Sequence, residues 1–471
     1  MESRRVVLGV GLMRVQAALA LVLTGAVLCG CATTEVADTK DKVDPKNPFP
    51  STYAPLPGGP TAITNATILT GTGEQIPNGM VLFKDGKIES VGANVSPPSG
   101  YTVVDAKGKW VTPGIIDVHS HLGVYPSPGV DSLSDGNEAT DPNTAEVWAE
   151  HSVWPQDEGF NAARRGGITT LQILPGSANL FGGRSVTLKN VPSRTMQGMK
   201  FPGAPYGLKM ACGENPKRVY GKKGRSPSTR MANVAGFRAA WIKAADYARK
   251  AKAAEKGDGA PPDRDLKLET LAGVLNGEIL VQNHCYRADE MAVMIDIAKE
   301  FGYKITAFHH ASESYKVADL LAKSGICSAT WAGWWGFKVE ALDGIEENAV
   351  LINKAGACVV IHSDDPNLTQ RLNQETAAAL AAGRRIGIDV PEAEAIKWIT
   401  ANAAKMIGVA DKTGTLEAGK MADVVIWNAD PFSVYATTDK VYIDGGLAYD
   451  RADPRYHPKS DFMLGHPKGG E

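Results

Sequence analysis

Two histidines stand one residue apart at the end of an apolar run, "VTPGIIDVHSH" (111–121). Side chains at positions i and i+2 of a strand point to the same face of a sheet. His119 and His121 would therefore present two imidazoles side by side, and two such nitrogens can share one metal ion. A bare His-x-His motif also fits two ordinary surface or core histidines, so the motif alone leaves both interpretations open.

Other apolar, strand-like runs also end in side chains that can bind a metal or transfer a proton. In order along the chain, these ends carry Lys209 and Glu214, His284, His309 and His310, and Asp364 and Asp365. In a barrel of eight β/α units the chemistry takes place at the C-terminal ends of the strands. Histidines and acids gathered at such ends indicate a metal or catalytic centre.

The order of the expected elements favours such a barrel. Between 113 and 412, helical stretches with a glycine near their ends alternate with short β-rich runs. This alternation is typical of a parallel sheet with helices outside it, and about eight strands fit into the segment. We therefore predict the α/β class and a (β/α)8 TIM barrel. No Gly-x-Gly-x-x-Gly motif follows a strand, which argues against a dinucleotide-binding sheet.

Short strands separated by Gly and Asn turns precede and follow the barrel segment, at 61–112 and 413–450. We predict that these two parts pair into one small β-sandwich domain formed from the N- and C-terminal segments. A long excursion at 228–276 is predicted to be an insertion after the fourth barrel strand, with a solvated basic helix face. The Pro- and Lys-rich tail at 451–471 is predicted to be loose.

The N-terminal segment has the composition of an export signal. Residues 1–30 combine a basic start with an apolar run (15–28) that is too short to span a bilayer comfortably. The run ends in "LCGC", which resembles a bacterial lipobox whose Cys31 becomes lipidated; a plain cleaved signal is the alternative. Ala32 points, within such signals, to the outer membrane of a Gram-negative bacterium. Residues 31–60 are predicted to be a flexible tether, so we expect a periplasmic, lipid-anchored protein.

The overall composition is that of a globular protein, with 43% hydrophobic and 22% charged residues and a net charge of −2. This charge does not indicate a nucleic-acid partner, and the lipid anchor is the only membrane contact we expect. Cys212, Cys285, Cys327 and Cys358 are scattered without a Cys-x-x-Cys motif. Three of them lie in apolar, strand-like runs, so we expect buried free thiols, although an exported protein can form disulfides.

The polar strand ends follow a pattern that resembles the amidohydrolase superfamily. That family has His-x-His on strand one, Lys or Glu on strand four, His on strands five and six and Asp on strand eight. "VTPGIIDVHSHLG" is similar to its opening segment and "TGTLEAGKMADVVIWNADP" to its closing segment, so the resemblance covers roughly 61–450. Within the family, "GENPKRVYG", "HHASESYK", "WWGFK" and "SDD" resemble the imidazolonepropionase-like subgroup, near prolidase-like and Xaa-Arg-type peptidases.

The resemblance implies a role for each of these residues. The implied metal ligands are His119 and His121 for one ion, His284 and His310 for a second, a carboxylated Lys209 as the bridge, and Asp364 as ligand and proton shuttle. Burial would favour the neutral amine that carboxylation needs. Glu214 is the alternative bridging ligand, and Lys209 would then pair with it simply as a cation. His309 is the alternative to His310, and Asp365 is expected to be a turn residue before Pro366.

The implied activity is hydrolysis of an amide, peptide or cyclic amide bond, dipeptides included. One or two divalent ions, with Zn favoured and Mn, Co or Fe also suited to these ligands, would activate a water and polarise the scissile carbonyl. Asp364 would take the proton from that water and give it to the leaving nitrogen.

The substrate is expected to be a small molecule or a dipeptide, and two groups of loop residues are candidates for its binding. Trp334 and Trp335 would form an apolar wall at the barrel mouth or pack beneath its rim. Arg218, Tyr220 and Arg230 follow strand four and would meet a substrate carboxylate or stay solvated.

Two other functional classes compete with the hydrolase. One is a non-catalytic envelope binding or scaffold lipoprotein with a degenerate amidohydrolase site, against which the nearly complete ligand set argues. The other is a metal-dependent lyase or isomerase on the same barrel, because a fold does not determine a reaction. Whether the chain forms a homo-oligomer stays open.

Overall fold

The computed structural model describes residues 47–93, 96–127, 129–334 and 336–456 of the chain. The predicted signal, Cys31, most of the tether, Trp335 and most of the tail lie outside the described residues. The chain divides into two units, Met1–Pro48 and Phe49–Glu471, and the architecture below is that of the second unit. None of its described helices is both long and apolar enough to cross a membrane.

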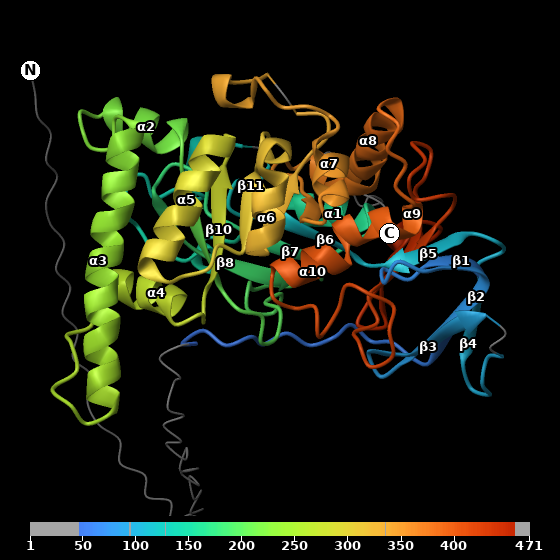
Figure 1. The fold of residues 1–471 in the computed structure, drawn as a ribbon. Coiled ribbons are helices and arrows are strands. Elements are labelled where there is room, and N and C mark those ends of the chain that lie inside the picture. Colours follow the sequence, from blue (N-terminus) through green and yellow to red (C-terminus); the bar gives the residue numbers. More distant parts are fainter. Residues whose placement is uncertain (1–46, 94–95, 128, 335, 457–471) are drawn as a thin grey trace, which may run out of the picture. The chain divides into compact units, whose positions relative to one another are not determined.

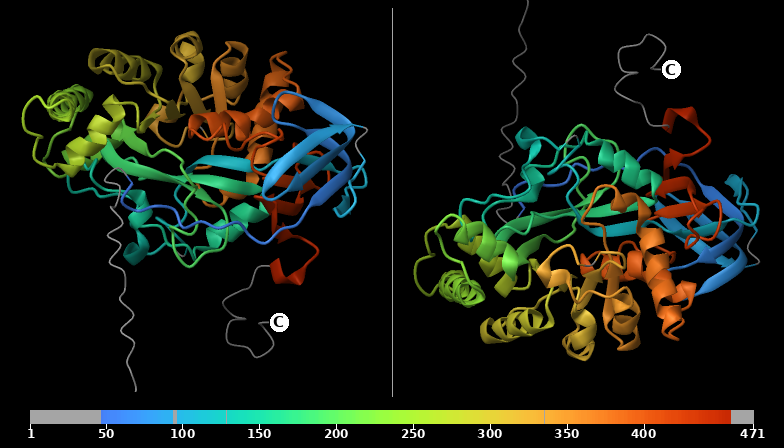
Figure 2. Two further views of the ribbon diagram at one scale, coloured as in Figure 1. Left: turned by 90° about the horizontal axis from the view of Figure 1, so that it is seen from below. Right: turned by 90° about the horizontal axis from the view of Figure 1, so that it is seen from above.

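A curled eight-stranded sheet forms the centre of this unit and confirms the barrel (Figures 1 and 2). Its strands, in spatial order, are β6 (Ile115–Ser120), β7 (Ile168–Ile173), β8 (Phe181–Lys189), β9 (Gly207–Ala211), β10 (Leu280–Cys285), β11 (Ala307–His310), β12 (Cys327–Thr330) and β13 (Cys358–Ile361). The two ends of the sheet meet after β13, where Asp364 N donates to His119 O at 2.9 Å. This contact brings the polar ends of the first and last strands together.

Helices lie outside the barrel sheet, as the alternation in the sequence predicts (Figure 2). They are α1 (Glu158–Arg165), α2 (Glu214–Gly221), α3 (Arg230–Glu255), α4 (Leu266–Leu275), α5 (Ala288–Phe301), α6 (Ala318–Ser324), α7 (Asn348–Lys354), α8 (Leu372–Arg385), α9 (Glu392–Ala395) and α10 (Ala401–Met406). The long excursion between β9 and β10 contains α2, α3 and α4. The first turn of α3 is capped by the Thr229 side chain, which accepts from Ala232 N.

Strand β8 departs from the regular parallel pattern, because it runs antiparallel to both β7 and β9. The connection from β7 to β8 spans only 174–180. A parallel crossover needs a dozen or more residues, so this short connection can only reverse the chain direction.

A second eight-stranded sheet combines both terminal segments and confirms the predicted small β domain, with its strands joined into one sheet. The strands are β1 (Thr61–Leu69), β2 (Gln75–Lys84), β3 (Lys87–Ala93), β4 (Thr102–Asp105), β5 (Trp110–Pro113), β14 (Val424–Trp427), β15 (Thr438–Ile443) and β16 (Gly446–Asp450). The two segments meet where β5 pairs antiparallel with β14, which places Trp110 opposite Trp427.

A buried charge cluster connects barrel strand β8 to the small sheet. Lys189 Nζ lies 2.9 Å from both carboxylate oxygens of Asp423 and 3.3 Å from Asp444 Oδ1. Thr413 Oγ1 donates to Asp423 Oδ2 at 2.6 Å, and the Tyr53 hydroxyl bonds to Asp444. All three charged side chains are almost completely buried, so the lysine is the cation that compensates two carboxylates in the interior.

The expectation of buried free thiols was wrong, because the four cysteines form the disulfides Cys212–Cys285 and Cys327–Cys358. Cys327 and Cys358 lie opposite each other on the neighbouring strands β12 and β13, with their Cα atoms 4.4 Å apart. Cys212 follows β9 and Cys285 ends β10, with Cα atoms 5.3 Å apart. Both pairs join adjacent strands, and the spacing of cysteines in a sequence does not reveal which strands are adjacent.

Removing one of these crosslinks should destabilise the barrel measurably. A Cys327→Ala, Cys358→Ala double variant should lose about 2–4 kcal/mol of unfolding free energy, because the bond closes a 31-residue separation in the unfolded chain. Urea unfolding of both proteins measures the difference, and full reduction should bring their midpoints much closer together. Four reactive thiols in the denatured, unreduced wild type would contradict the pairing.

Candidate metal centre

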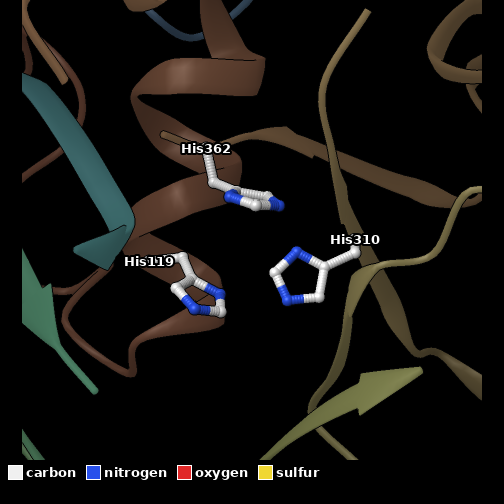
Figure 3. Close-up of side chains that lie close together, drawn as sticks. All are labelled: His119, His310 and His362. Atoms are coloured by element: carbon white, nitrogen blue, oxygen red, sulfur yellow. The ribbon is translucent and has the colours of Figure 1, made fainter. Parts of the chain in front are cut away.

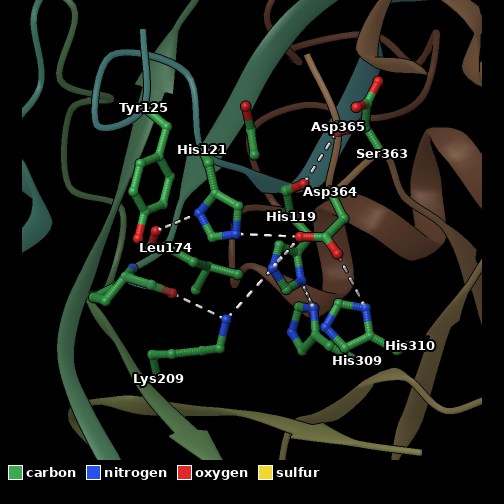
Figure 4. A network of polar contacts seen from close by, with 12 residues as sticks. His119, His121, Tyr125, Leu174, Lys209, His309, His310, Ser363, Asp364 and Asp365 are labelled. Carbon is green, nitrogen blue, oxygen red and sulfur yellow. Dashed lines mark hydrogen bonds and ion pairs between the residues drawn. The ribbon is translucent and has the colours of Figure 1, made fainter. Parts of the chain in front are cut away.

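Two histidine rings and one carboxylate converge at the C-terminal end of the barrel (Figure 4). His119 is in β6 and His121 follows it at the strand end. The Nε2 atoms of His119 and His121 lie 3.3 and 3.2 Å from the same oxygen of Asp364, Oδ1. The other oxygen, Oδ2, lies 3.7 Å from Nδ1 of His310. The ends of β6 and β11 therefore present three nitrogens around the carboxylate that follows β13.

Unusual backbone conformations aim two of these side chains at the centre. Neighbouring residues of a strand normally face opposite sides, so His309 and His310 would not both point inward. At the end of β11, His310 has a φ of +70°, and after β13 Asp364 has a φ of +59°. Non-glycine residues adopt this left-handed region at a cost of about 1–2 kcal/mol each, and such strain persists where a site requires it.

The orientation of His121 is set by a backbone carbonyl. Its Nδ1 lies 2.9 Å from Leu174 O, and a carbonyl oxygen only accepts hydrogen bonds. Nδ1 therefore carries a proton, which leaves Nε2, the nitrogen that faces Asp364, as the one available to a metal. This is the tautomer that a metal ligand at Nε2 needs.

Burial keeps the imidazoles of this centre uncharged. Loss of solvent, aided by the nearby Lys209 cation, lowers the pKa of His119 and His310 well below the ordinary value. Burial also lowers the pKa of His284 well below its usual range, with the Lys338 cation adding to the effect. Burial opposes ionisation of Asp364, but His121, His362 and Lys209 outweigh it and lower the pKa of that carboxyl. The centre therefore combines neutral nitrogens with an ionised carboxylate, the protonation states that divalent metals bind.

Lys209 lies on β9, completely buried beside the histidines. Its Nζ donates to Pro175 O at 3.0 Å and lies 3.4 Å from His119 Nε2. Burial lowers the pKa of Lys209 to about 8, although the Asp364 carboxylate acts in the opposite direction. Glu214 does not pair with this amine: its carboxylate lies 3.8 Å from Lys338 Nζ.

The donor set fits a divalent metal ion. One nitrogen each of His119 and His121 and one oxygen of Asp364 lie within 4.8 Å of one another, and so do ring nitrogens of His119, His310 and His362 (Figure 3). Both ring nitrogens of His284 are buried without a hydrogen-bond partner in the described part of the chain. Buried polar atoms are nearly always satisfied, so these orphaned nitrogens indicate a missing partner. Nitrogen and carboxylate donors suit Zn and its neighbours.

A sequence model of the Amidohydrolase family matches residues 110–448. The chain belongs to the amidohydrolase family. An amidohydrolase of Hapsidospora irregularis named tasK is 32% identical over 433 residues, which is 83% of this chain but 43% of that relative, so the chain spans less than half of its length. Imidazolonepropionase of Mesorhizobium japonicum is 25% identical over 396 residues, 75% of the chain and 87% of the relative, in agreement with the subgroup that the motifs resemble.

The crystal structure of an amidohydrolase from Thermotoga maritima superposes with a TM-score of 0.77 at 35% identity, covering 83% of this chain and all of that one. Proteins of this family are typically metal-dependent, and the histidine and aspartate groups above are ligands that this chain offers to a metal.

A cavity of about 410 Å³ opens onto the centre of this amidohydrolase and is lined in part by His121, His284, His310 and Asp364. Of the residues predicted to bind substrate, Arg218 lines this cavity. Glu214 also lines the cavity, next to Lys338. Among the described residues, Glu214 does not belong to either of the side-chain groups that could hold a metal ion. Its role as a bridge stays a prediction.

Three of the other predicted substrate contacts lie elsewhere. Tyr220 is fully buried, with its hydroxyl at Asp141 O and Asn179 Oδ1, so it does not reach the cavity. Arg230 pairs with Glu290 at 2.9 Å and Glu340 at 2.5 Å. Trp334 packs against Trp331, at 5.2 Å between ring centroids, and is not among the residues that line the cavity. Trp335 lies outside the described residues.

Sequence reasoning passed over His362, which stacks on the His119 ring with 5.0 Å between centroids. Burial lowers the pKa of His362 to about 3, and its ring nitrogens have no partner among the described residues. A signal was available, because His362 directly follows the apolar run of the last strand and stands two positions before Asp364. His309 lies behind His119, with its Nδ1 at 2.8 Å from His119 Nδ1, and does not line the cavity.

Proposed function

We propose that this amidohydrolase hydrolyses the carbon–nitrogen bond of an amide, a peptide or a cyclic amide. One observation carries the proposal: an ionised Asp364 shares the C-terminal mouth of the barrel with the nitrogens of His119, His121 and His310. A bound divalent ion supplies Lewis acidity at this mouth, which polarises a carbonyl and acidifies a water molecule. The carboxylate of Asp364 then accepts the proton of the attacking water and returns it to the leaving nitrogen.

The proposed substrate carries a carboxylate, as dipeptides and N-acyl amino acids do. Arg218 presents a guanidinium to the cavity, and the ammonium group of Lys338 lies over the Tyr286 ring at 3.8 Å from its centroid. Phe337 and Tyr286 supply apolar wall on the same side. A guanidinium binds a carboxylate through two parallel hydrogen bonds, which would hold one end of the substrate away from the reacting carbonyl.

We also propose that Lys209 is carboxylated and bridges two ions. Its amine is buried next to His119 without a carboxylate partner among its described contacts, and an unpaired buried cation is unfavourable. Reaction of the neutral amine with carbon dioxide forms the N–C bond of a carbamate anion and releases one proton, and the metal ions would compensate the new negative charge.

Metal content tests this bridge. The mature protein (31–471 with Cys31 replaced) should contain about two metal ions per chain, and its Lys209→Ala variant clearly fewer, by elemental analysis. Glu214→Gln serves as the matched control and should retain the wild-type content. If Lys209→Ala kept two metal ions per chain and Glu214→Gln lost metal, Glu214 rather than Lys209 would be the bridging ligand.

The proposed location is the periplasm, with Cys31 lipidated and anchored in the outer membrane. The composition of residues 1–30, which predicts an export signal, supports this location. The two disulfides support it too, because such bonds persist in oxidising compartments. A radiolabelled palmitate incorporation assay in the native host, with Cys31→Ser as the unlabelled control, tests the anchor.

The reaction itself is tested by incubating the metal-loaded protein with N-acyl amino acids and dipeptides in ¹⁸O-labelled water. Hydrolysis yields a free amine and one ¹⁸O atom in the new acid. Products without ¹⁸O would favour a lyase or isomerase, and tight binding without turnover would favour a binding lipoprotein.

A further inference from the structure

A chain of three hydrogen bonds runs behind His119, on the side away from Asp364. His119 Nδ1 lies 2.8 Å from His309 Nδ1, and His309 Nε2 lies 2.8 Å from Gln282 Oε1 (the first contact is drawn in Figure 4). Gln282 Nε2 donates to the backbone carbonyl of Met406, at the end of α10, at 3.3 Å. The three side chains of this relay lie on β6, β10 and β11.

The donor and acceptor of each of these three hydrogen bonds follow from the Met406 carbonyl at the end of the chain of bonds. A backbone carbonyl only accepts, so the Gln282 atom that faces Met406 is the amide nitrogen and the atom that faces His309 is the carbonyl oxygen. His309 must then donate from Nε2. In a neutral imidazole this leaves Nδ1 of His309 as an acceptor, and Nδ1 of His119 carries the proton that it accepts.

A proton on Nδ1 of His119 leaves its other ring nitrogen, Nε2, unprotonated. With its proton on Nδ1, His119 turns the lone pair of Nε2 toward Asp364 Oδ1 at 3.3 Å and Lys209 Nζ at 3.4 Å, where a metal would be held. Gln282, His309 and His119 are all completely buried, so water cannot replace a lost partner. His121 reaches the same tautomer by a different route, through the main-chain oxygen of Leu174.

We propose that Gln282 and His309 are positioning residues that fix the Nδ1–H tautomer of His119 and thereby preorganise the centre for its metal. Neither side chain touches metal or substrate; both act through His119. The proposal rests on the metal centre of the proposed function and is independent of the bond that is cleaved. Groups that orient metal-binding histidines typically change metal affinity by 10- to 100-fold when they are removed.

The first test is the tautomer itself, in metal-free wild-type protein. The ¹⁵N and ¹H shifts of histidine-labelled protein distinguish protonated from unprotonated ring nitrogens, and a His119→Gln spectrum assigns the signal. We expect His119 protonated at Nδ1 and His309 protonated at Nε2. A His119 protonated at Nε2 in the wild type would overturn the proposal, whether or not any substrate is ever found.

The second test is metal affinity in matched variants. Gln282→Leu removes the acceptor of His309 and should raise the Kd for Zn²⁺ by 10- to 100-fold. Gln282→Glu keeps an oxygen acceptor for His309, and its acid proton replaces the amide N–H that donates to Met406 O, so its Kd should return toward the wild-type value. Gln172→Leu is the matched control, because Gln172 is equally buried in barrel strand β7 and its side chain has no described hydrogen-bond partner. Its Kd should not change.

The outcomes separate positioning from a general loss of structure. Equal weakening in Gln282→Leu and Gln172→Leu, or no rescue by Gln282→Glu with a native circular dichroism spectrum, would assign the effect to packing and reject the relay. A wild type that binds zinc through the predicted tautomer but hydrolyses nothing would reject the proposed reaction and leave the relay intact.

Discussion

Asp364→Asn should lower kcat for the best carbon–nitrogen substrate by about 10²–10⁴-fold, the usual contribution of a positioned general base. The asparagine amide is similar in shape but cannot accept the proton of the attacking water. It also removes the negative charge that lies between the nitrogens of His119 and His121. Steady-state kinetics on protein of measured metal content gives the result, so that loss of metal and loss of the base are separated.

The neighbouring acid offers a matched control. Asp365 Oδ1 accepts from Asn367 N at 2.8 Å and Leu368 N at 3.0 Å, as a turn residue does. Asp365→Asn keeps an oxygen that can accept both bonds, so kcat should stay near the wild-type value. Asp364→Asn with full metal occupancy and more than a tenth of wild-type turnover would remove Asp364 from the proton-transfer role.

Lys189→Met should reduce the free energy of unfolding by about 3–5 kcal/mol, the cost of breaking a buried ion pair from one side. The variant leaves the carboxylates of Asp423 and Asp444 in the interior without their cation. Methionine fills a similar volume, so the loss reports on charge rather than on a cavity. Urea unfolding followed by circular dichroism measures it.

An exposed ion pair provides the comparison. Arg238 and Glu300 are paired at 2.7 Å with about half of each side chain in solvent, where water stabilises either charge alone. Arg238→Met should therefore leave the unfolding midpoint unchanged. If Lys189→Met is as stable as Arg238→Met, then the buried cluster does not hold the barrel and the small sheet together.

The sequence predicts the barrel and the polar ends of its strands because both depend on local pattern. Alternating helices and apolar runs specify the order of strands, and parallel strands bring their C-terminal ends to one edge. The sequence alone assigns His119 and Asp364 to that edge, although they stand 245 positions apart in the chain.

The sequence does not predict features that depend on contacts between residues far apart in the chain. The partners of the cysteines follow from which strands are adjacent. The arginine at the start of α3 was predicted to meet substrate but pairs with Glu290 and Glu340, which come from α5 and the loop after β12. The His310 side chain points inward because its backbone is left-handed, and a histidine in the sequence does not predict that conformation as a glycine would.

The pairing of β5 with β14 has a consequence for biosynthesis. Trp110 and its partner Trp427 leave the ribosome more than 300 residues apart, which at usual elongation rates means a delay on the order of 15–60 s. During that interval the early strands of the small sheet expose an unpaired edge, the kind of surface that invites association with other chains. We therefore expect the nascent chain to be prone to association until its last strands arrive, and we expect variants that weaken β14 to aggregate more than the wild type during synthesis.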